Sequence, residues 1–427
     1  MKPSTTDHRQ GRLFEQRLSQ MLNPKHELCF LASHIKWDIL DEKLASFFDE
    51  EEGKPAKPSR LIAGIMILQH MYRLSDENVV QKWVENPYWQ LFCGYDYLQW
   101  QFPIHPTTLT KWRNRLGAKG LEDLLALVIN TARSLEAVEE SSFKKVIVDT
   151  TVAPKAIAYP TDTKLYFSSL NKLVLFARSA KIPLRQSYAR IAPKVYRKAN
   201  TLFHTRKYKK AMKEVSRLKR FCKKVFDQIL KACTDNPELG KNVKPVFFAI
   251  AELLMQGREG MEKIYSLHEP KVECIAKGKA RQKYEFGCKM SLVVTHKEGF
   301  VIGAEALQGA PYDGHTLQGA LNHAERLTGK KINQAFVDKG YRSHGVTSSS
   351  VMISGSKKNL SPSQSKDLKR RQSIEPQIGH MKSDGKLGRN YLKGVLGDKM
   401  HVLLCAIGHN MRYLVNFFRR KTQALLV

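Results

Sequence analysis

The spacing of apolar residues changes several times along the chain, and each change indicates a different kind of element. From residue 59 to residue 137, apolar residues recur at three- and four-residue steps, which predicts a helical domain. Ser59 and Ser75 stand where short polar side chains cap the N-termini of helices. Residues 1–58 begin polar and end in an acidic run and a Pro-rich stretch, so they predict an N-terminal arm and linker.

A short basic helix is predicted near the end of this helical region. It is introduced by His105-Pro106-Thr107-Thr108, and Gly117 is a natural helix stop. Its place after a helical pair is typical of a DNA-recognition helix, and an ordinary surface helix with Trp112 in the core fits equally well. The basic residues that would contact DNA are Lys111, Arg113 and Arg115.

Runs typical of β-strands follow the helical region. The first covers residues 144–153, is rich in β-branched residues, and carries Asp149 near its C-terminal end. Further strands are expected at residues 284–295, 300–307, 332–337 and 351–354. Helices are expected at residues 316–327, 364–384 and 398–420. This order of strand, hairpin, helix and strand predicts an α/β fold with a mixed sheet flanked by helices.

Between the first two of these strands, residues 161–262 return to a helical spacing and are strongly basic. Apolar residues from 212 to 229 fall on one helical face, which leaves the other faces cationic. We therefore expect residues 161–282 to form a basic, mostly helical insertion whose surface follows DNA phosphates. Its candidate DNA contacts are Lys209, Lys210, Arg217 and Arg220.

The charge of the chain indicates a polyanionic partner. Its 427 residues include 71 Lys and Arg against 40 Asp and Glu, which gives a net charge of +31. Double-stranded DNA is the expected partner, because each phosphate contact by Lys or Arg releases condensed counterions. An anionic membrane is a weaker alternative, since no long amphipathic basic helix stands out.

Cysteine usage and hydropathy favour a cytoplasmic protein. The seven Cys are scattered and form no CxxC pair, which argues against a disulfide framework and a zinc ribbon. The opening residues are polar, so no signal peptide is expected. The most apolar runs, Leu61–Met71 and His401–Phe418, are too short or too interrupted to span a bilayer, so no membrane partner is predicted.

Three acidic residues stand out by position. Asp149 ends one predicted strand, Asp338 directly follows another, and Glu375 lies on a predicted helix. Residues just past strand ends gather at one edge of such a sheet, where a helical Glu can complete a cluster. Carboxylates are the ligands that Mg²⁺ prefers, and Mn²⁺ fits as well. Two such ions can activate a hydroxyl and stabilise the leaving oxygen of a phosphodiester.

Basic residues surround Glu375. Arg371 and Lys382 lie four residues before it and seven after it, so helical periodicity places both near its face. Together with Arg370 they are placed to hold DNA phosphates beside the metal ions. His380 lies off that face by about 140°, and it either touches DNA or is a surface histidine.

The stretch from Arg370 to Lys382 resembles the C-terminal signature of bacterial insertion-sequence DDE transposases, in particular the insertion sequence five group within the insertion sequence four superfamily. Arg371, Glu375 and Lys382 match the spacing of that signature, with Leu368 at the position of its Tyr. The second-Asp motif is matched by Asp338-Lys339-Gly340-Tyr341, and the first by Val148-Asp149-Thr150-Thr151. The resemblance covers residues 55–420.

The resemblance implies an RNase H-like catalytic domain formed by residues 144–160 and 283–420, with the first acid on its first strand and the second on its fourth. Residues 59–137 would be the helical DNA-end-binding domain, ahead of the insertion at 161–282. Members of the family bind terminal inverted repeats as homodimers or higher multimers, and they transfer 3′-hydroxyl ends into target DNA. The protein would then be a bacterial, nucleoid-associated DNA transposase.

Some alternatives remain beside this interpretation. Asp313 is a second candidate for the second acid, but it sits in a Pro/Gly turn, whereas Asp338 follows an apolar strand. A transposase-derived DNA-binding protein without catalysis is the alternative function, and a non-mobile nuclease with the same triad is another. The intact set of acids favours the active enzyme.

Overall fold

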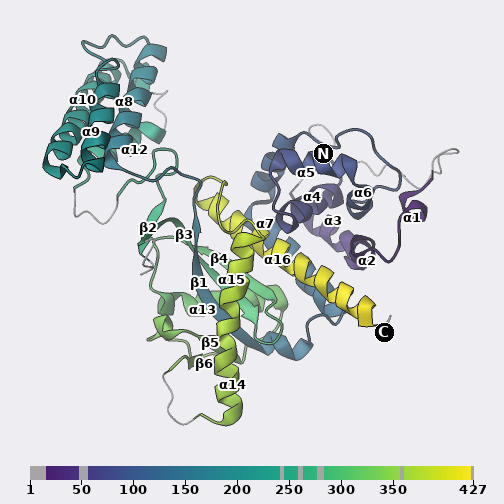
Figure 1. Cartoon of the computed structure of the whole chain (residues 1–427). Coiled ribbons are helices and arrows are strands. Elements are labelled where there is room, and N and C mark those ends of the chain that lie inside the picture. The colour runs from purple at the N-terminus through teal and green to yellow at the C-terminus, as the bar shows by residue number, and fades with distance from the viewer. Residues whose placement is uncertain are drawn as a thin grey trace. The chain divides into compact units, whose positions relative to one another are not determined.

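The computed structural model describes residues 16–47, 56–240, 245–257, 263–276, 283–355 and 360–424 (Figure 1). The chain divides into two compact units. Met1–Pro154 and Cys288–Val427 form one, here called the sheet unit, and Lys155–Gly287 form the other, here called the helical unit. None of the helices in these described ranges has the length and apolarity needed to cross a membrane.

The sheet unit begins with helices, and they start earlier than the sequence predicted. They are α1 (Leu18–Met21), α2 (Glu27–His34), α3 (Trp37–Ala45), α4 (Ser59–Met71), α5 (Asp76–Glu85), α6 (Pro87–Phe92) and α7 (Pro106–Ser134). The arm expected over residues 1–58 is therefore wrong for α1, α2 and α3. Leu28, Leu31, Leu40 and Leu44 are buried at helical spacing, although polar residues between them mask the pattern.

Capping residues and a glycine determine where several of these helices begin and end. Ser75 caps α5 by accepting a hydrogen bond from the backbone N–H of Asn78, at 3.1 Å. Ser59 is instead the first residue of α4, with Pro58 at the cap position, which corrects the predicted cap. Gly117 has a φ of 58° and breaks α7 into two helices, so the predicted stop is present, but a second helix follows at once.

The sheet is mixed, as predicted. Its strands are β1 (Lys145–Pro154), β2 (Glu273–Ala276), β3 (Tyr284–Thr295), β4 (Val301–Leu307), β5 (Gln334–Val337) and β6 (Ser350–Ile353). Their order is β2-β3-β1-β5-β6, with β4 paired to β3 in an antiparallel hairpin. The pairs β1–β5 and β5–β6 are parallel.

Helices cover this sheet. They are α13 (Asp313–Thr328), α14 (Pro362–Arg370), α15 (Ile374–Ser383) and α16 (Gly394–Ala424), with 3₁₀ turns η1 (Glu140–Lys144), η2 (Lys339–Tyr341) and η3 (Arg371–Ser373). Both α13 and α16 pack against β4, and α15 packs against β1. The single helix expected at residues 364–384 is thus two helices, separated by η3.

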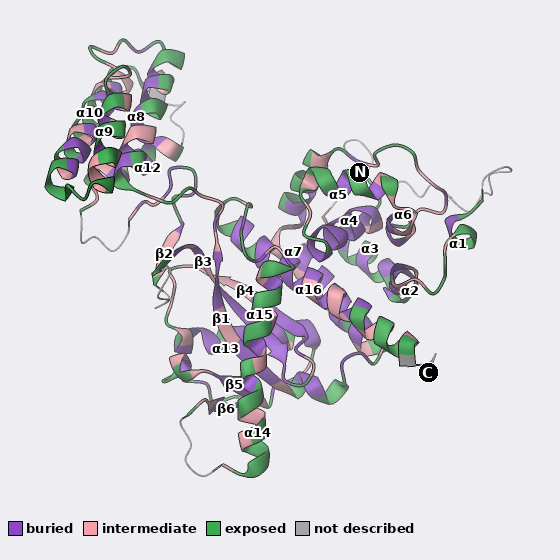
Figure 2. Ribbon diagram, in the orientation of Figure 1, coloured by how far each residue is buried: buried purple, intermediate pink, exposed green. Residues whose placement is uncertain are grey.

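One continuous core holds the N-terminal helices and the sheet together. It joins Leu61 of α4 and Leu125 of α7 to Val148 of β1 and Phe336 of β5. Figure 2 shows buried residues running through α4, α7, α16 and the strands. Residues 59–137 were expected to form a domain of their own, but they share this core with the sheet, because α16 packs on both α4 and α7.

The helical unit has its own core. Its helices are α8 (Asp162–Ser179), α9 (Ala192–His204), α10 (Tyr208–Asp235), α11 (Pro237–Gly240) and α12 (Pro245–Met255). Leu218, Val225 and Ile229 of α10 are fully buried, which agrees with the apolar face predicted for this segment. The unit also contains β2, which the sequence did not predict, paired with the first residues of β3.

Candidate active site

Two of the predicted acids belong to neighbouring strands of the sheet, with Asp149 on β1 and Asp338 directly after β5. The parallel register pairs Ile147 of β1 with Phe336 of β5. Two residues further along, the same register places Asp149 beside Asp338. Because adjacent strands are about 4.8 Å apart, both carboxylates occupy one edge of the sheet. Asp149 interrupts an otherwise buried strand, and its side chain is 17% exposed.

A tight turn fixes the carboxylate of Asp338. Its Oδ1 accepts a hydrogen bond from the backbone N–H of Gly340, at 2.8 Å. A Cβ atom on Gly340 would lie 3.0 Å from Asp338 Oδ1 and 3.2 Å from Asp313 Oδ2. The glycine of the Asp-Lys-Gly-Tyr motif therefore leaves room for two carboxylates that approach the same point.

Asp313 is the second of these carboxylates and belongs to the same cluster. Thr150 Oγ1, on β1, donates to its Oδ1 at 2.8 Å, and Lys289 Nζ, on β3, lies 2.7 Å from the same oxygen. Asp313 is the first residue of α13, so it ties this helix to two strands. The sequence favoured Asp338 over Asp313 as the second acid, because Asp313 sits in a Pro/Gly turn. No local pattern indicated Lys289, because its partner is far away along the chain.

Tyr341 completes the motif and is completely buried. Burial raises the pKa of its phenol well above the ordinary value, and the nearby charges of Asp149, Asp313 and Asp338 raise it further, against Arg371. The phenol therefore stays protonated and remains a donor. Within the described ranges, its hydroxyl has no hydrogen-bond partner.

Glu375 reaches this cluster through Arg371. The guanidinium of Arg371 lies 3.2 Å from Glu375 Oε1 and 3.8 Å from Asp149 Oδ2. Arg371 is 8% exposed, whereas the side chain of Glu375 is 63% exposed. The structure thus places the predicted phosphate ligand Arg371 between two acids, at η3, where the helix is interrupted.

The donor set fits a hard divalent cation in its chemistry. Asp149 and Asp338 offer carboxylate oxygens at one edge, and Mg²⁺ is commonly held by one or two carboxylates together with substrate phosphates. In the part of the chain that the structure describes, no three His, Cys, Asp or Glu side chains are grouped closely enough to hold a metal ion. Glu375 is held by Arg371 instead.

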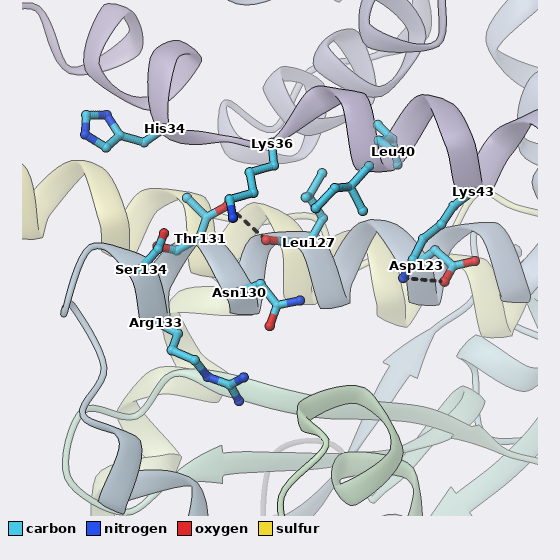
Figure 3. A pocket seen from close by; sticks show the side chains of 11 residues that line it. His34, Lys36, Leu40, Lys43, Asp123, Leu127, Asn130, Thr131, Arg133 and Ser134 are labelled. Atoms are coloured by element: carbon cyan, nitrogen blue, oxygen red, sulfur yellow. Dashed lines mark hydrogen bonds and ion pairs between the residues drawn. The ribbon is translucent and has the colours of Figure 1, made fainter.

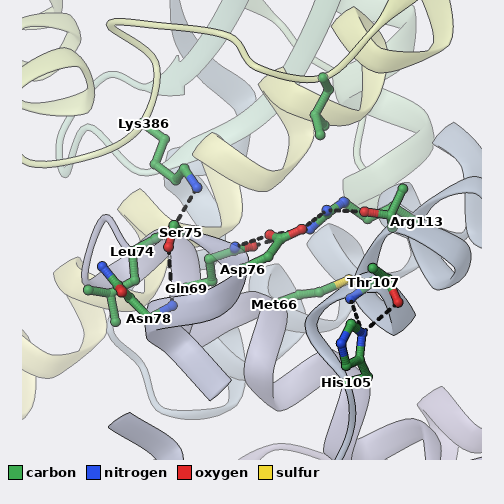
Figure 4. A network of polar contacts seen from close by, with 12 residues as sticks. Met66, Gln69, Leu74, Ser75, Asp76, Asn78, His105, Thr107, Arg113 and Lys386 are labelled. Carbon is green, nitrogen blue, oxygen red and sulfur yellow. Dashed lines mark hydrogen bonds and ion pairs between the residues drawn. The ribbon is translucent and has the colours of Figure 1, made fainter. Parts of the chain in front are cut away.

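The predicted DNA contacts on α7 divide into two kinds. Lys111 and Arg115 are exposed. Arg113 is 4% exposed, and its guanidinium binds both carboxylate oxygens of Asp76 on α5 (Figure 4). The expectation that Arg113 contacts DNA is therefore corrected, because the residue holds α5 against α7. Trp112 is buried beside it, as the ordinary helix interpretation required.

The basic residues near Glu375 also differ in their surroundings. Arg370 is exposed, but its guanidinium donates to the backbone carbonyls of His296 and Lys297, which attaches α14 to the β3–β4 turn. Lys382 is half-buried, near the end of α15. The exposed His380 lies 2.7 Å from Asp384 Oδ2 one helical turn on, which is typical of a surface pair.

On α10 of the helical unit, the predicted contacts Lys209, Lys210 and Arg220 are exposed. Arg217 is half-buried, lies 3.7 Å from Glu214, and stacks its guanidinium over the ring of Phe221 at 5.5 Å. Three of the four predicted cations on this helix are thus available at the surface.

A small pocket lies away from these acids, between α3 and α7 (Figure 3). Its volume is about 310 Å³, Leu40 and Leu127 form part of its lining, and Lys43 pairs with Asp123 at 3.2 Å beside it. It contains none of the candidate acids, so it is not part of the candidate active site.

Comparison with known proteins links the chain to a family. A protein of Rhizobium meliloti, described as "Uncharacterized protein ORF8 in nfe locus", is 43% identical over 208 residues, which are 49% of this chain and 100% of that protein. The chain belongs to the same family as this protein. In addition, residues 16–115 match the family model described as "Transposase domain (DUF772)".

The matched domain supports a transposase family, and it includes the helices α1 to α3 that the sequence analysis did not predict. The match to a transposase domain suggests an enzyme that cleaves DNA. No solved structure matches the chain.

The two candidates for the second acid can be separated by substitution. We expect Asp313→Asn to retain most DNA cleavage, because the amide oxygen still accepts from Thr150, and Asp338→Asn to lose at least about a thousandfold. Asp313→Ala should lower the free energy of unfolding by about 1–3 kcal/mol, since it removes the anionic partner of Lys289 and leaves its Nζ bound to the carbonyl oxygen of Pro311, at 2.7 Å. Cleavage of labelled DNA and urea unfolding test both statements. Loss of cleavage in Asp313→Asn with activity in Asp338→Asn would reverse the assignment.

Proposed function

We propose that this protein is the DNA transposase of an insertion sequence, which binds the terminal repeats of its element, cleaves DNA and transfers the 3′ ends to a target. The proposal is supported above all by the parallel pairing of β1 with β5, whose register, continued by two residues, brings Asp149 level with Asp338 just past the end of β5. The transposase domain at residues 16–115 supports it independently.

Asp149, Asp338 and Glu375 are the proposed catalytic carboxylates, and they would hold two Mg²⁺ ions, with Mn²⁺ as a substitute. When bound, such ions polarise the attacking hydroxyl and neutralise the leaving oxygen of a phosphodiester. Asp338 is oriented by the N–H of Gly340, and Asp149 by the N–H of Thr150 at 2.7 Å. The chain therefore fixes two acids before DNA arrives, which lowers the reorganisation needed at the reacting phosphate.

The cationic residues of the site have a complementary role in this proposal. Arg371 neutralises part of the negative charge of Asp149 and Glu375 in the free protein, and its guanidinium would change partner to a DNA phosphate bound beside these acids. Lys111, Arg115 and the exposed cations of α10 would contact the DNA backbone.

The fold of the catalytic domain, the transposase group and the oligomeric state are also proposed. Apart from β2, which lies in the helical unit, Asp338 follows the fourth strand, and this supports an RNase H-like catalytic domain. The motifs around Asp149, Asp338 and Glu375 support the insertion sequence five group. We further propose that the protein acts as a homodimer or higher multimer on two DNA ends.

Strand transfer by the whole chain tests the proposed function. With Mg²⁺, the wild type should join the labelled 3′ ends of its own element to a target duplex, and EDTA should stop the reaction. Glu375→Gln should join none, while Glu85→Gln, which changes an exposed Glu at the end of α5, should match the wild type. Tight end binding without joining in the wild type would instead favour a DNA-binding relative without catalysis.

A further inference from the structure

A large groove lies in the sheet unit, beside the helix that carries Glu375. Its volume is about 900 Å³. One wall comes from the end of α4, the start of α5 and the first part of α7, where Thr110 and Asn114 face it. The other wall comes from the end of α15 and the segment between α15 and α16, including Lys382 and Arg389.

The lining of this groove is strongly cationic. Arg73, Lys382, Lys386, Arg389 and Lys393 all contribute to it, in addition to the buried Arg113. The acids of the groove do not balance this charge, because Asp76 is already paired with Arg113 and Glu77 is the only other acid in the lining. Within the described ranges, Arg73, Lys386, Arg389 and Lys393 form no ion pair with a carboxylate. The groove therefore has an excess of positive charge, which favours a polyanion.

Backbone contacts hold the cations in place rather than neutralising them. Lys386 Nζ donates to the carbonyl oxygen of Leu74 at 2.6 Å (Figure 4). The guanidinium of Arg73 donates to the carbonyl oxygen of Ser383, also at 2.6 Å. Each of these hydrogen bonds joins one wall of the groove to the other. Burial lowers the pKa of Lys386, which agrees with a cation that is held partly out of water.

The segment that carries Arg389 and Lys393 is anchored next to β1. Asn390 is 1% exposed, its backbone N–H donates to the carbonyl of Pro154 at 2.7 Å, and its side chain donates to Asp398 Oδ1 at 2.7 Å. Pro154 ends the strand that carries Asp149. The cations of this segment are thus fixed in position relative to the candidate acids.

The groove is linked to the candidate active site by α15, the helix that carries both Glu375 and the lining residue Lys382. Lys382 lies seven residues after Glu375 on α15, which corresponds to about 10 Å along a helix at 1.5 Å per residue. An extended polyanion in the groove would therefore pass within a few nucleotides of the acids. Small-ligand sites of this size are lined mostly by apolar residues with few polar groups, whereas most of the residues that line this groove are charged or polar.

We infer that this groove binds the phosphodiester backbone of DNA next to the candidate active site, with Arg73, Arg389 and Lys393 as phosphate contacts. Tyr391 is 65% exposed at the groove, and the guanidinium of Arg389 lies over its ring at 5.6 Å. That stacking aligns the guanidinium while its N–H groups remain available at the edge. The inference rests on the proposed function, because it locates the DNA on which the transposase acts.

Binding of a labelled random-sequence duplex tests the inference, because phosphate contacts do not depend on sequence. The variant Arg389→Ala/Lys393→Ala should weaken binding at least tenfold at low salt. It should also lower the slope of log affinity against log salt by about 1.8, which is about 0.9 for each lost phosphate contact. The matched control Lys119→Ala/Lys331→Ala removes two exposed cations of the same unit outside the groove, and we expect a smaller change in affinity and slope.

Chemical footprinting of the unchanged protein provides a second measurement. Acetylation of Lys386 and Lys393 should slow at least fivefold when the duplex is bound, while Lys331 should react at the same rate. If the wild type binds the duplex but the groove variant and the footprint do not differ from their controls, the groove is not the DNA site and the proposed function stands. If the wild type binds no DNA, both the groove inference and the proposed function are overturned.

Discussion

Asp149→Asn and Asp338→Asn should each lower the rate of DNA cleavage by at least about a thousandfold. Asparagine has nearly the same shape but carries no charge, so each variant removes one anionic oxygen ligand from the sheet edge. The expected loss corresponds to about 4 kcal/mol of transition-state stabilisation, which is typical of charge stabilisation by a bound metal ion. Rates of 3′-end formation on a labelled duplex with the element's ends provide the measurement.

DNA binding should survive the same substitutions. Loss of a negative charge beside a phosphate makes binding equal or slightly tighter, so the dissociation constant should not rise. Asp384→Asn is the matched control, since Asp384 is an exposed acid just past the end of α15 and pairs only with surface groups. Cleavage by Asp338→Asn or Asp149→Asn above a tenth of the wild-type rate would remove that residue from the catalytic set.

The sequence predicted the two sheet acids because local pattern is sufficient for them. An apolar run that leads directly into Asp338 predicts a strand end, and a β-branched run around Asp149 predicts another. The structure then places both at the same level, through the parallel register of β1 and β5. The hairpin of β3 and β4 was predicted for the same reason, since both strands and their turn are contiguous in sequence.

Long-range pairing explains what the sequence did not predict. Arg113 looked like one of three equivalent cations on a basic helix, but Asp76 lies 37 residues earlier and removes it from the surface. Lys289 and Asp313 are 24 residues apart and meet only because α13 starts at the sheet edge. Such partners are specified by the fold, and helical or strand periodicity contains no information about them.

Two further differences have local physical causes. The helix expected through Glu375 is interrupted at Arg371, where the guanidinium turns inward to Asp149 and Glu375. The N-terminal helices were interpreted as an arm because the chain begins polar, although Trp37 and Leu40 are buried against the same core as the sheet. Family matching from residue 16 would have indicated a folded region there.

Asp76→Ala should lower the stability of the sheet unit by about 3–5 kcal/mol, because it leaves the buried guanidinium of Arg113 uncompensated. The side chain of Arg113 is 5% exposed, and it also lies 3.4 Å from Gln69 Oε1 and 3.2 Å from Thr110 Oγ1 (Figure 4). These contacts join α4, α5 and α7. Arg113→Met should cost less, because Asp76 is 24% exposed and regains water when its partner is removed.

Tryptophan fluorescence measures the loss of stability in the sheet unit. All five Trp residues precede residue 113, so urea unfolding followed by fluorescence monitors the sheet unit and not the helical unit. The double variant Asp76→Ala/Arg113→Met should be more stable than Asp76→Ala alone, since it no longer buries an unpaired charge. A double variant as unstable as the sum of the two single variants would show that the ion pair is not the cause.

The pH dependence gives an independent check on the same pair. Burial alone would raise the pKa of Asp76, but hydrogen bonds and charge from Arg113 outweigh it, with help from Gln69, and the pKa is lowered overall. A lowered pKa in the folded state means that the stabilisation is complete above the unfolded pKa of about 3.9 and is lost as the pH falls through the folded value. The stability difference between wild type and Asp76→Ala should therefore be constant near neutral pH and shrink below about pH 4.

In Glu139→Ala, which breaks an exposed pair with Lys297, no measurable change in stability is expected at any of these pH values. If the difference between wild type and Asp76→Ala grew on acidification, Asp76 would not be ionised in the folded protein, and the buried ion pair would not be what joins α5 to α7.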